Sequence, residues 1–192
     1  MKLRNYQIDQ EWVCMKIQPM AIQRIYNKVW PKCEILELDN DQRNTLKQVL
    51  DFGGADKLLK YPDGTVSFLG QRFRTFTYAT HDDFTLRYSR PSQRKTECRK
   101  VIESLQQNKM VAGFYAYGHV NEVENGFLRF RILKFRDFLE YWRDGKLPEA
   151  KLIPNRDRSA TFLAWPFNEI PSELILFEIP SKPETITLED FM

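Results

Sequence analysis

Residues 56–90 read DKLLKYPDGTVSFLGQRFRTFTYATHDDFTLRYSR and contain three segments with the composition of β-strands. The first segment precedes Pro62, and the second, at 65–74, follows Gly64 and starts with β-branched and aromatic residues. Because proline and glycine stand where a type I turn with a glycine bulge needs them, these two segments are predicted to form a hairpin. The third segment, 84–90, alternates with period 2 and predicts a half-buried strand.

The second segment ends in Gln71-Arg72-Phe73-Arg74, which a purely structural strand does not need. Polar residues at a strand end often face a binding site. The arginines here and in the third segment alternate with aromatic residues, a pattern that suits stacking on bases and pairing with phosphates. It also suits an ordinary solvated strand face, so both interpretations stay open.

The composition is that of one globular domain with appendages: 192 residues, 42% hydrophobic and 29% charged, with a net charge of +3. That charge is too small to indicate polyanion binding by itself, but basic residues are concentrated in residues 72–100. Three cysteines without a C-x-x-C spacing support neither a disulfide framework nor a zinc site. No apolar signal core or membrane-length apolar window is present, so we expect a soluble, intracellular protein.

Other segments of the chain show the periodicity of helices and strands. Residues 1–17 have no clear period and are predicted to be a strand or an irregular arm. Helices are expected from Pro19 to about 29, from 41 to 50 with a stripe of Leu46, Val49 and Leu50, from 96 to 107 and from 135 to 144. Strands are expected at 33–38, 110–119, 127–134 and 173–179, the last within an extended region at 146–183.

The central order, a helix at 41–50, three strands within 56–90, a helix at 96–107 and a strand at 110–119, resembles the core of the restriction-endonuclease-like nucleases, the PD-(D/E)XK superfamily. The resemblance covers about residues 41–120 and implies an α/β fold with an α-β-β-β-α-β mixed sheet flanked by helices. The predicted core spans about 41–145 within a single domain at 1–183. An N-terminal helical and strand extension and a Pro-rich C-terminal extension flank the core.

The resemblance also implies a metal-dependent site. In that family an Asp at a strand start and an acid or Gln on the next strand hold Mg²⁺ or Mn²⁺, and a Lys two residues later stabilises charge at the phosphate. Asp56 and Gln71 match the two ligands, but Phe73 stands where the lysine belongs. The cation would therefore be Arg72 or Arg74, on the face opposite Gln71 unless a bulge intervenes at Gly70.

Two functions from different classes follow. The first is a DNA nuclease, or a relative of one, in which Arg87, Arg90, Arg94 and Lys95 contact backbone phosphates. The second is a non-catalytic DNA-binding or adaptor protein of replication or repair, with Asp56 a strand-edge acid paired with a lysine. An enzyme of small metabolites has no supporting motif, and a homodimer stays among the expected assemblies. His81 and His119 are interpreted as structural, and Tyr115, Tyr117 and Trp142 as core.

The carboxyl-terminal residues 184–192 are predicted to be a peptide tail that resembles the PCNA-interacting box, the sliding-clamp-binding peptide of replication and repair proteins. Leu188 and Phe191 fit that motif, Thr185 replaces its Gln and Met192 replaces its second aromatic residue. Such a peptide forms one turn that places its apolar side chains in a single pocket. A frayed end, or a turn that packs on the chain's own core, is the alternative.

Overall fold

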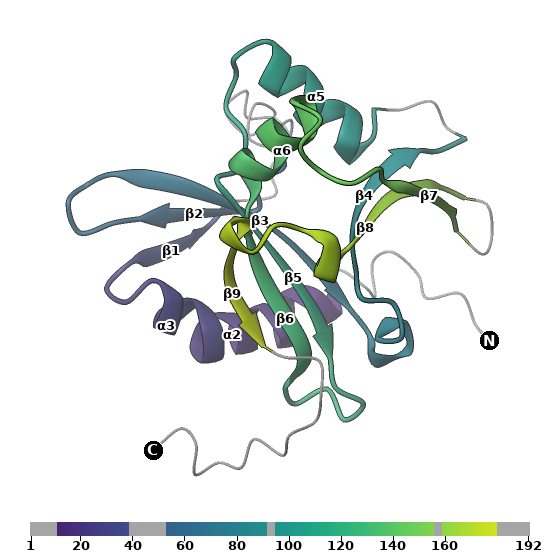
Figure 1. The fold of residues 1–192 in the computed structure, drawn as a ribbon. Coiled ribbons are helices and arrows are strands. Elements are labelled where there is room, and N and C mark those ends of the chain that lie inside the picture. The colour runs from purple at the N-terminus through teal and green to yellow at the C-terminus, as the bar shows by residue number, and fades with distance from the viewer. Residues whose placement is uncertain (1–10, 39–52, 92–94, 156–158, 180–192) are drawn as a thin grey trace.

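The computed structural model describes residues 11–38, 53–91, 95–155 and 159–179, which form a mixed α/β protein with two β-sheets (Figure 1). The larger sheet has six strands in the order β1-β2-β3-β5-β6-β9, and the smaller has the order β4-β8-β7. The strands of the larger sheet are β1 (Glu34–Glu37), β2 (Lys57–Lys60), β3 (Val66–Arg74), β5 (Phe114–Val120), β6 (Phe127–Lys134) and β9 (Ile175–Ile179). Those of the smaller sheet are β4 (Asp83–Ser89), β7 (Lys151–Pro154) and β8 (Thr161–Pro166).

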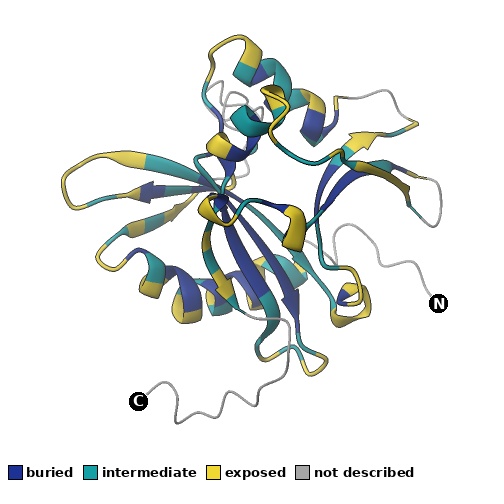
Figure 2. Cartoon of the chain, in the orientation of Figure 1, coloured by how far each residue is buried: buried dark blue, intermediate teal, exposed yellow. Residues whose placement is uncertain are grey.

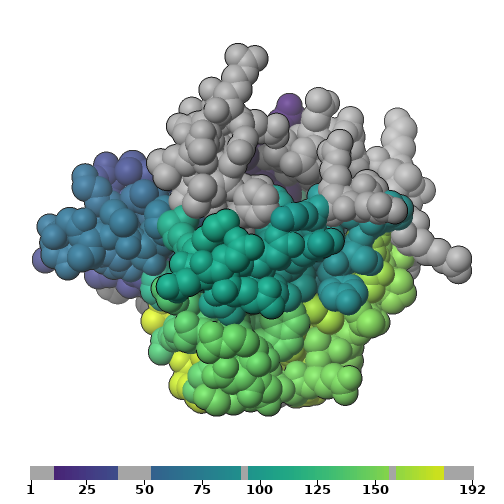
Figure 3. Space-filling view, turned by 90° about the horizontal axis from the view of Figure 1, so that it is seen from above, coloured from purple at the N-terminus to yellow at the C-terminus, as the bar shows by residue number. Residues whose placement is uncertain are grey.

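The larger sheet is mixed because β3 and β5 run parallel while the other neighbours in it are antiparallel. A parallel pair needs a long crossover connection. Here the crossover contains β4 and the helix α5 (Glu97–Gln106), and a second helix, α6 (Phe135–Arg143), follows β6 directly. Seen from the side of these two helices, the blue β2–β3 hairpin lies at one end of the molecule (Figure 3).

The predicted hairpin is confirmed: β2 and β3 are antiparallel neighbours joined by a tight turn. The Gly64 amide donates to the Tyr61 carbonyl at 2.9 Å, and Gly64 has φ +83°, which a residue with a side chain rarely adopts. Asp63 accepts hydrogen bonds from both the backbone and the hydroxyl of Thr65. The turn tip is exposed (Figure 2).

One helix covers one face of the larger sheet. It runs through η1 (Val13–Ile17), α2 (Gln18–Ala21), η2 (Ile22–Tyr26) and α3 (Asn27–Val29). The prediction of a strand or irregular arm is therefore wrong for residues 11–17, and the helix does not begin near Pro19. The apolar residues of this segment, at 12, 13, 15 and 17, do not form one helical stripe, and of residues 13–17 only Ile17 is buried.

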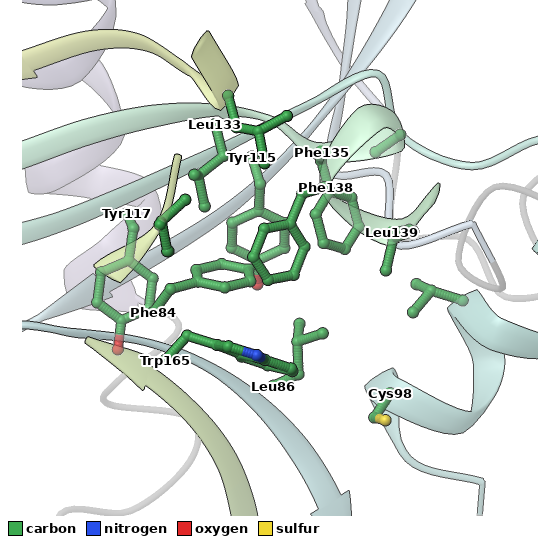
Figure 4. Packing of buried hydrophobic residues seen from close by; sticks show 14 of the residues in the cluster. Phe84, Leu86, Cys98, Tyr115, Tyr117, Leu133, Phe135, Phe138, Leu139 and Trp165 are labelled. Carbon is green, nitrogen blue, oxygen red and sulfur yellow. The ribbon is translucent and has the colours of Figure 1, made fainter. Parts of the chain in front are cut away.

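The opposite face of the larger sheet is covered by α5, α6 and the smaller sheet, which share one aromatic core (Figure 4). Phe84 of β4 lies at its centre, with ring centroids 5.3 Å from Tyr115, 5.8 Å from Tyr117 and 5.0 Å from Phe138. The prediction that these two tyrosines are core residues is confirmed.

The predicted third strand exists as β4, but it pairs with β8 in the smaller sheet and not with the hairpin. Period 2 identifies the two faces of a strand but not its neighbour, and β8 is contributed by residues far along the chain. The third strand beside the hairpin is β1. The expected strand at 110–119 begins only at Phe114, and the one at 173–179 begins at Ile175.

The remaining predicted elements within the described residues are present. Thr96 caps α5, and its hydroxyl oxygen accepts from the Arg99 amide. β6, α6 and the strand within 33–38 also match the prediction. The expected helix at 41–50, residues 1–10 and the tail at 184–192 lie outside the described residues.

Candidate functional site

Strand β3 carries two sets of polar side chains on opposite faces of the larger sheet. Its pairing with β5 is continuous from Leu69 to Arg74, so no bulge interrupts the alternation at Gly70. Gln71 points toward the N-terminal helix, where its side chain contacts Tyr26. Arg72 points toward the smaller sheet, where it contacts Thr85. The face that carries Gln71 is therefore separate from the face that carries Arg72 and Arg74.

Asp56 and Gln71 meet although 15 residues separate them. Asp56 stands exposed immediately before β2, and its Oδ2 accepts a hydrogen bond from the Gln71 backbone amide at 2.7 Å. The two strands are tightly packed here, because a Cβ added at Gly70 would lie 2.4 Å from the carbonyl oxygen of Gly54. Asp56, immediately before β2, and Gln71, on β3, therefore lie next to each other.

A buried lysine follows this acid in the sequence. The side chain of Lys57 is 0% exposed, and its Nζ donates to Gln18 Oε1 at 3.0 Å and to Glu37. The Tyr26 hydroxyl donates to Gln71 Oε1 at 3.2 Å on the same face of the sheet. We refer to the six residues of this face and edge as the Lys57 cluster: Gln18, Tyr26, Glu37, Asp56, Lys57 and Gln71.

The electrostatics of the Lys57 cluster centre on Tyr26. Burial raises the pKa of Tyr26 well above its ordinary value, and the negative charges of Asp56 and Glu37 raise it further. The phenol therefore stays protonated and acts as a donor. Both carboxylates lie close enough to act on one hydroxyl group.

The oxygen atoms of Asp56, Glu37 and Gln71 are of the kind that Mg²⁺ and Mn²⁺ prefer. The three groups suit such an ion in donor type, and each is engaged within the protein: Asp56 by the Gln71 backbone amide, Glu37 by Lys57 and Gln71 by Tyr26. No group of three or more His, Cys, Asp and Glu residues suited to a metal ion occurs in residues 11–38, 53–91, 95–155 and 159–179.

Lys57 is a site residue outside the nuclease motif, and its burial could be predicted from the alternation of residues 57–60. Lys57 and Leu59 are two positions apart on a strand, so both lie on the buried face. Leu58 and Lys60 lie on the opposite face. The two lysines of this strand have opposite environments for that reason: Lys60 is half-exposed and pairs with Glu34 at 3.0 Å.

The second polar group lies between the two sheets. The guanidinium carbons of Arg72, Arg74 and Arg87 are 5.6, 6.0 and 5.8 Å from the ring centroid of Phe162. Phe162 is the cross-strand partner of Arg87 in the smaller sheet. We refer to these four residues as the Phe162 arginine cluster.

Arg72 is neutralised within its own environment. It is 18% exposed, forms an ion pair with Glu97 at 2.8 Å and donates to the Thr85 carbonyl at 2.9 Å. The same carboxylate accepts the hydroxyl of Tyr115. The structure thus does not bring Arg72 beside the carboxamide of Gln71, where the predicted charge stabiliser would stand.

Arg74 and Arg87 have no carboxylate partner within the part of the chain that the structure describes. Arg74 donates to Thr85 Oγ1 at 2.9 Å and lies over the Tyr78 and Tyr117 rings. The Nε of Arg87 is buried, and no described residue is its hydrogen-bond partner. Burial lowers the pKa of Arg87, and the positive charge of Arg72 lowers it further.

The other predicted DNA contacts lie near the start of α5. Arg90 donates to the carbonyl of Lys95 at 2.8 Å, and Lys95 pairs with Glu103 of α5. Arg94 lies outside the described residues. The structure therefore places Arg87 in the Phe162 arginine cluster and Arg90 and Lys95 beside the helix.

Comparison of the chain with protein-family models, with curated proteins and with solved structures found no match in any of the three. Among the described residues, no helix is long and apolar enough to cross a membrane.

Proposed function

We propose that this chain is a nucleic-acid-processing protein, a metal-dependent DNA nuclease or a relative of one, with its catalytic edge at the Lys57 cluster. The observation that carries the proposal is the contact of the Asp56 carboxylate with the backbone amide of Gln71, beside a buried lysine, while the side-chain oxygen of Gln71 accepts from Tyr26. An acid at a strand start, an amide oxygen on the next strand and an ammonium group on the same face are the three kinds of group that the nuclease resemblance requires.

The order of elements supports the same proposal. With β4 set aside because it belongs to the smaller sheet, the N-terminal helix, β1, β2, β3, α5 and β5 follow the order α-β-β-β-α-β, with β1 in place of the strand that the sequence suggested. The supporting feature is the position of Asp56 immediately before β2 and of Gln71 on the neighbouring strand β3. A restriction-endonuclease-like core remains part of the proposal.

The proposed roles follow from the two faces of β3. Asp56 and Gln71 would hold Mg²⁺ or Mn²⁺, which supplies Lewis-acid chemistry at a phosphate and a nucleophilic water when bound. Lys57 would take the role of the charge-stabilising cation in place of Arg72 or Arg74, because it lies on the face of Gln71 while Arg72 is paired with Glu97. Since its side chain is 0% exposed, Lys57 would act through its charge and not by contact with the phosphate.

The test is cleavage of branched, single-stranded and duplex DNA in the presence of Mn²⁺. Asp56→Ala should abolish cutting, and Lys57→Met, which keeps the length of the side chain, should reduce it by about 10²–10³-fold. The exposed Asp137 of α6 is the matched control, and Asp137→Asn should cut like the wild type. Cutting that survives Asp56→Ala would contradict this assignment of the site.

A second candidate function, non-catalytic DNA binding, is favoured by the uncompensated charge of the Phe162 arginine cluster. In that case Arg87, Arg90, Arg94 and Lys95 contact phosphates and Asp56 has no chemical role. The same cleavage experiment distinguishes a nuclease from a non-catalytic DNA-binding protein. Absence of cutting on every substrate, with DNA affinity unchanged by Asp56→Ala, would leave binding alone.

Recruitment to a sliding clamp through Thr185, Leu188, Phe191 and Met192 is also proposed, on the sequence of the tail alone. A tethered partner would raise the local concentration of a weakly selective enzyme on DNA. Calorimetry against the clamp of the source organism should show binding by the full chain and none by a chain ending at Pro183. Equal affinities for the two chains would remove the clamp from the proposal.

A further inference from the structure

We infer that Arg74 and Arg87, held against the ring of Phe162, form a binding site for phosphate groups of a nucleic-acid strand. The inference deepens the proposed function, on which it rests for the identity of the ligand. It assigns phosphate recognition to the inner surface between the two sheets, apart from the Lys57 cluster.

The charge balance is the first argument. Three guanidinium groups lie within about 6 Å of one ring centroid, and the carboxylate of Glu97 pairs with Arg72. In the described part of the chain Arg74 and Arg87 form no ion pair of their own, and the one Glu97 carboxylate that acts on Arg87 is shared with Arg72. Because like charges at short range repel, folding stability alone does not favour this arrangement, whereas binding of an anion does.

The fixed positions of the two side chains are the second argument. Thr85 Oγ1 accepts from Arg74 at 2.9 Å and from Arg72 at 3.2 Å, so one hydroxyl aligns two neighbouring guanidiniums. Phe162 lies opposite Arg87 in the strand register. A guanidinium that is already oriented loses less entropy when it binds an oxyanion.

The available donors are the third argument. Arg74 and Arg87 are neither fully buried nor fully exposed, so they are accessible while still being partly desolvated. The Nε of Arg87 is buried without a partner among the described residues and is not itself a contact for a ligand, whereas the guanidinium plane of an arginine matches two oxygens of a phosphate. Two such groups suit either one terminal phosphate or two neighbouring phosphodiesters.

The first experiment measures DNA affinity against salt concentration for Arg74→Gln and Arg87→Gln. Each variant should bind about tenfold more weakly and show a salt slope lower by about one phosphate contact. Arg136→Gln and Arg143→Gln on α6 are the controls, because both arginines are exposed and paired with carboxylates. They should change the affinity by less than about twofold.

The second measurement separates a binding role from a structural one. Since the unliganded cluster holds like charges together, Arg87→Gln should leave the free energy of unfolding unchanged or raise it. A variant that binds DNA like the wild type but unfolds more easily would overturn the inference. If Arg87→Gln fails to fold, Arg87→Lys, which keeps the charge but loses the two-point contact, replaces it.

The third measurement uses inorganic phosphate and therefore does not depend on the nuclease proposal. Phosphate should raise the melting temperature of the wild type and of Arg136→Gln but not that of Arg74→Gln or Arg87→Gln. An equal rise in all four proteins, or none in any, would overturn the site whether or not DNA is cut. Comparison of 5′-phosphorylated with unphosphorylated DNA then distinguishes a terminal phosphate from backbone phosphodiesters.

Discussion

Two glutamate–lysine pairs join the same two strands and differ in burial. Glu37 pairs with Lys57, whose side chain is 0% exposed, and Glu34 pairs with Lys60, whose side chain is 52% exposed. A buried ammonium that loses a hydrogen-bonding anion is hydrated less easily than an exposed one, although the Glu37 side chain is itself 62% exposed. The same chemical change should therefore have different consequences at the two pairs.

We predict that Glu37→Ala lowers the free energy of unfolding by about 1–3 kcal/mol. Glu34→Ala, on the same strand, should lower it by no more than about 0.5 kcal/mol, because exposed ion pairs contribute little. Urea denaturation of the two variants measures the difference. Equal losses would show that Lys57 does not depend on its anionic partner.

His119 makes the stability depend on pH. His119 is 2% exposed. Burial, and after it the positive charges of Arg74 and Arg129, lower the pKa of His119 from 6.5 to about 4. Asp82 opposes this shift and Arg131 adds to it. The unfolded chain thus binds a proton near pH 6.5 that the folded chain does not accept until about pH 4.

This contribution to stability is complete above about pH 6.5 and decreases as the pH falls toward 4. We predict that the wild type loses about 2–3 kcal/mol over this window through His119. His119→Asn should flatten that part of the pH profile, and His81→Asn, at an exposed position, should not. The slope of unfolding free energy against pH is the measurement, and identical slopes in all three proteins would contradict the assignment.

At the scale of elements, the β2–β3 hairpin combines an open turn with a crowded strand. A Cβ at Gly70 would lie 2.4 Å from the Gly54 carbonyl oxygen and 2.8 Å from the Tyr115 ring. A Cβ at Gly64 would meet nothing within 4 Å, but the residue there has φ +83°. Substitution of Gly70 is limited by the space around it, and substitution of Gly64 is limited by its backbone conformation.

We predict that Gly70→Ala lowers the free energy of unfolding by about 2–3 kcal/mol, because backbone atoms must move to admit the methyl group. Gly64→Ala should cost about 1 kcal/mol, since a left-handed conformation is unfavourable for alanine. Under the proposed nuclease function, Gly70→Ala should also weaken DNA cutting by displacing the segment before Asp56. Thermal unfolding and the cleavage assay check both statements, and a neutral Gly70→Ala would contradict the crowding.

At the scale of the molecule, the two sheets share one core through aromatic residues of the smaller sheet. Trp165 of β8 lies 5.2 Å from the ring of Phe138 and 5.2 Å from that of Trp142, both in α6. Figure 4 shows Trp165 below Phe84 in the same cluster. The smaller sheet therefore has no separate core of its own in the described residues.

We predict that the two sheets unfold in a single transition, with coincident curves from tryptophan fluorescence and far-ultraviolet circular dichroism. Trp165→Ala should lower the stability of the whole domain by about 3–5 kcal/mol. Leu152→Ala on β7, at a position 60% exposed, should have an effect below about 0.5 kcal/mol. A separate early transition of the smaller sheet in Trp165→Ala would contradict a shared core.

The sequence by itself determined the local elements with strong periodicity or turn chemistry. The hairpin follows from Pro62 and Gly64, α5 from Thr96 and its apolar stripe, and the two faces of β3 from simple alternation. These features depend on residues near one another in the chain. The opposite orientation of Gln71 and Arg72 could be predicted for the same reason.

Only the tertiary structure decided which strands are neighbours and which charges are compensated. Alternation in residues 84–90 does not reveal β8 as the partner, and nothing local to Lys57 shows that Gln18 and Glu37 surround it. The same holds for Arg87, which forms no ion pair of its own among the described residues because Glu97 is paired with Arg72. Strand pairing and charge balance are set by contacts between distant residues, so local sequence does not determine them.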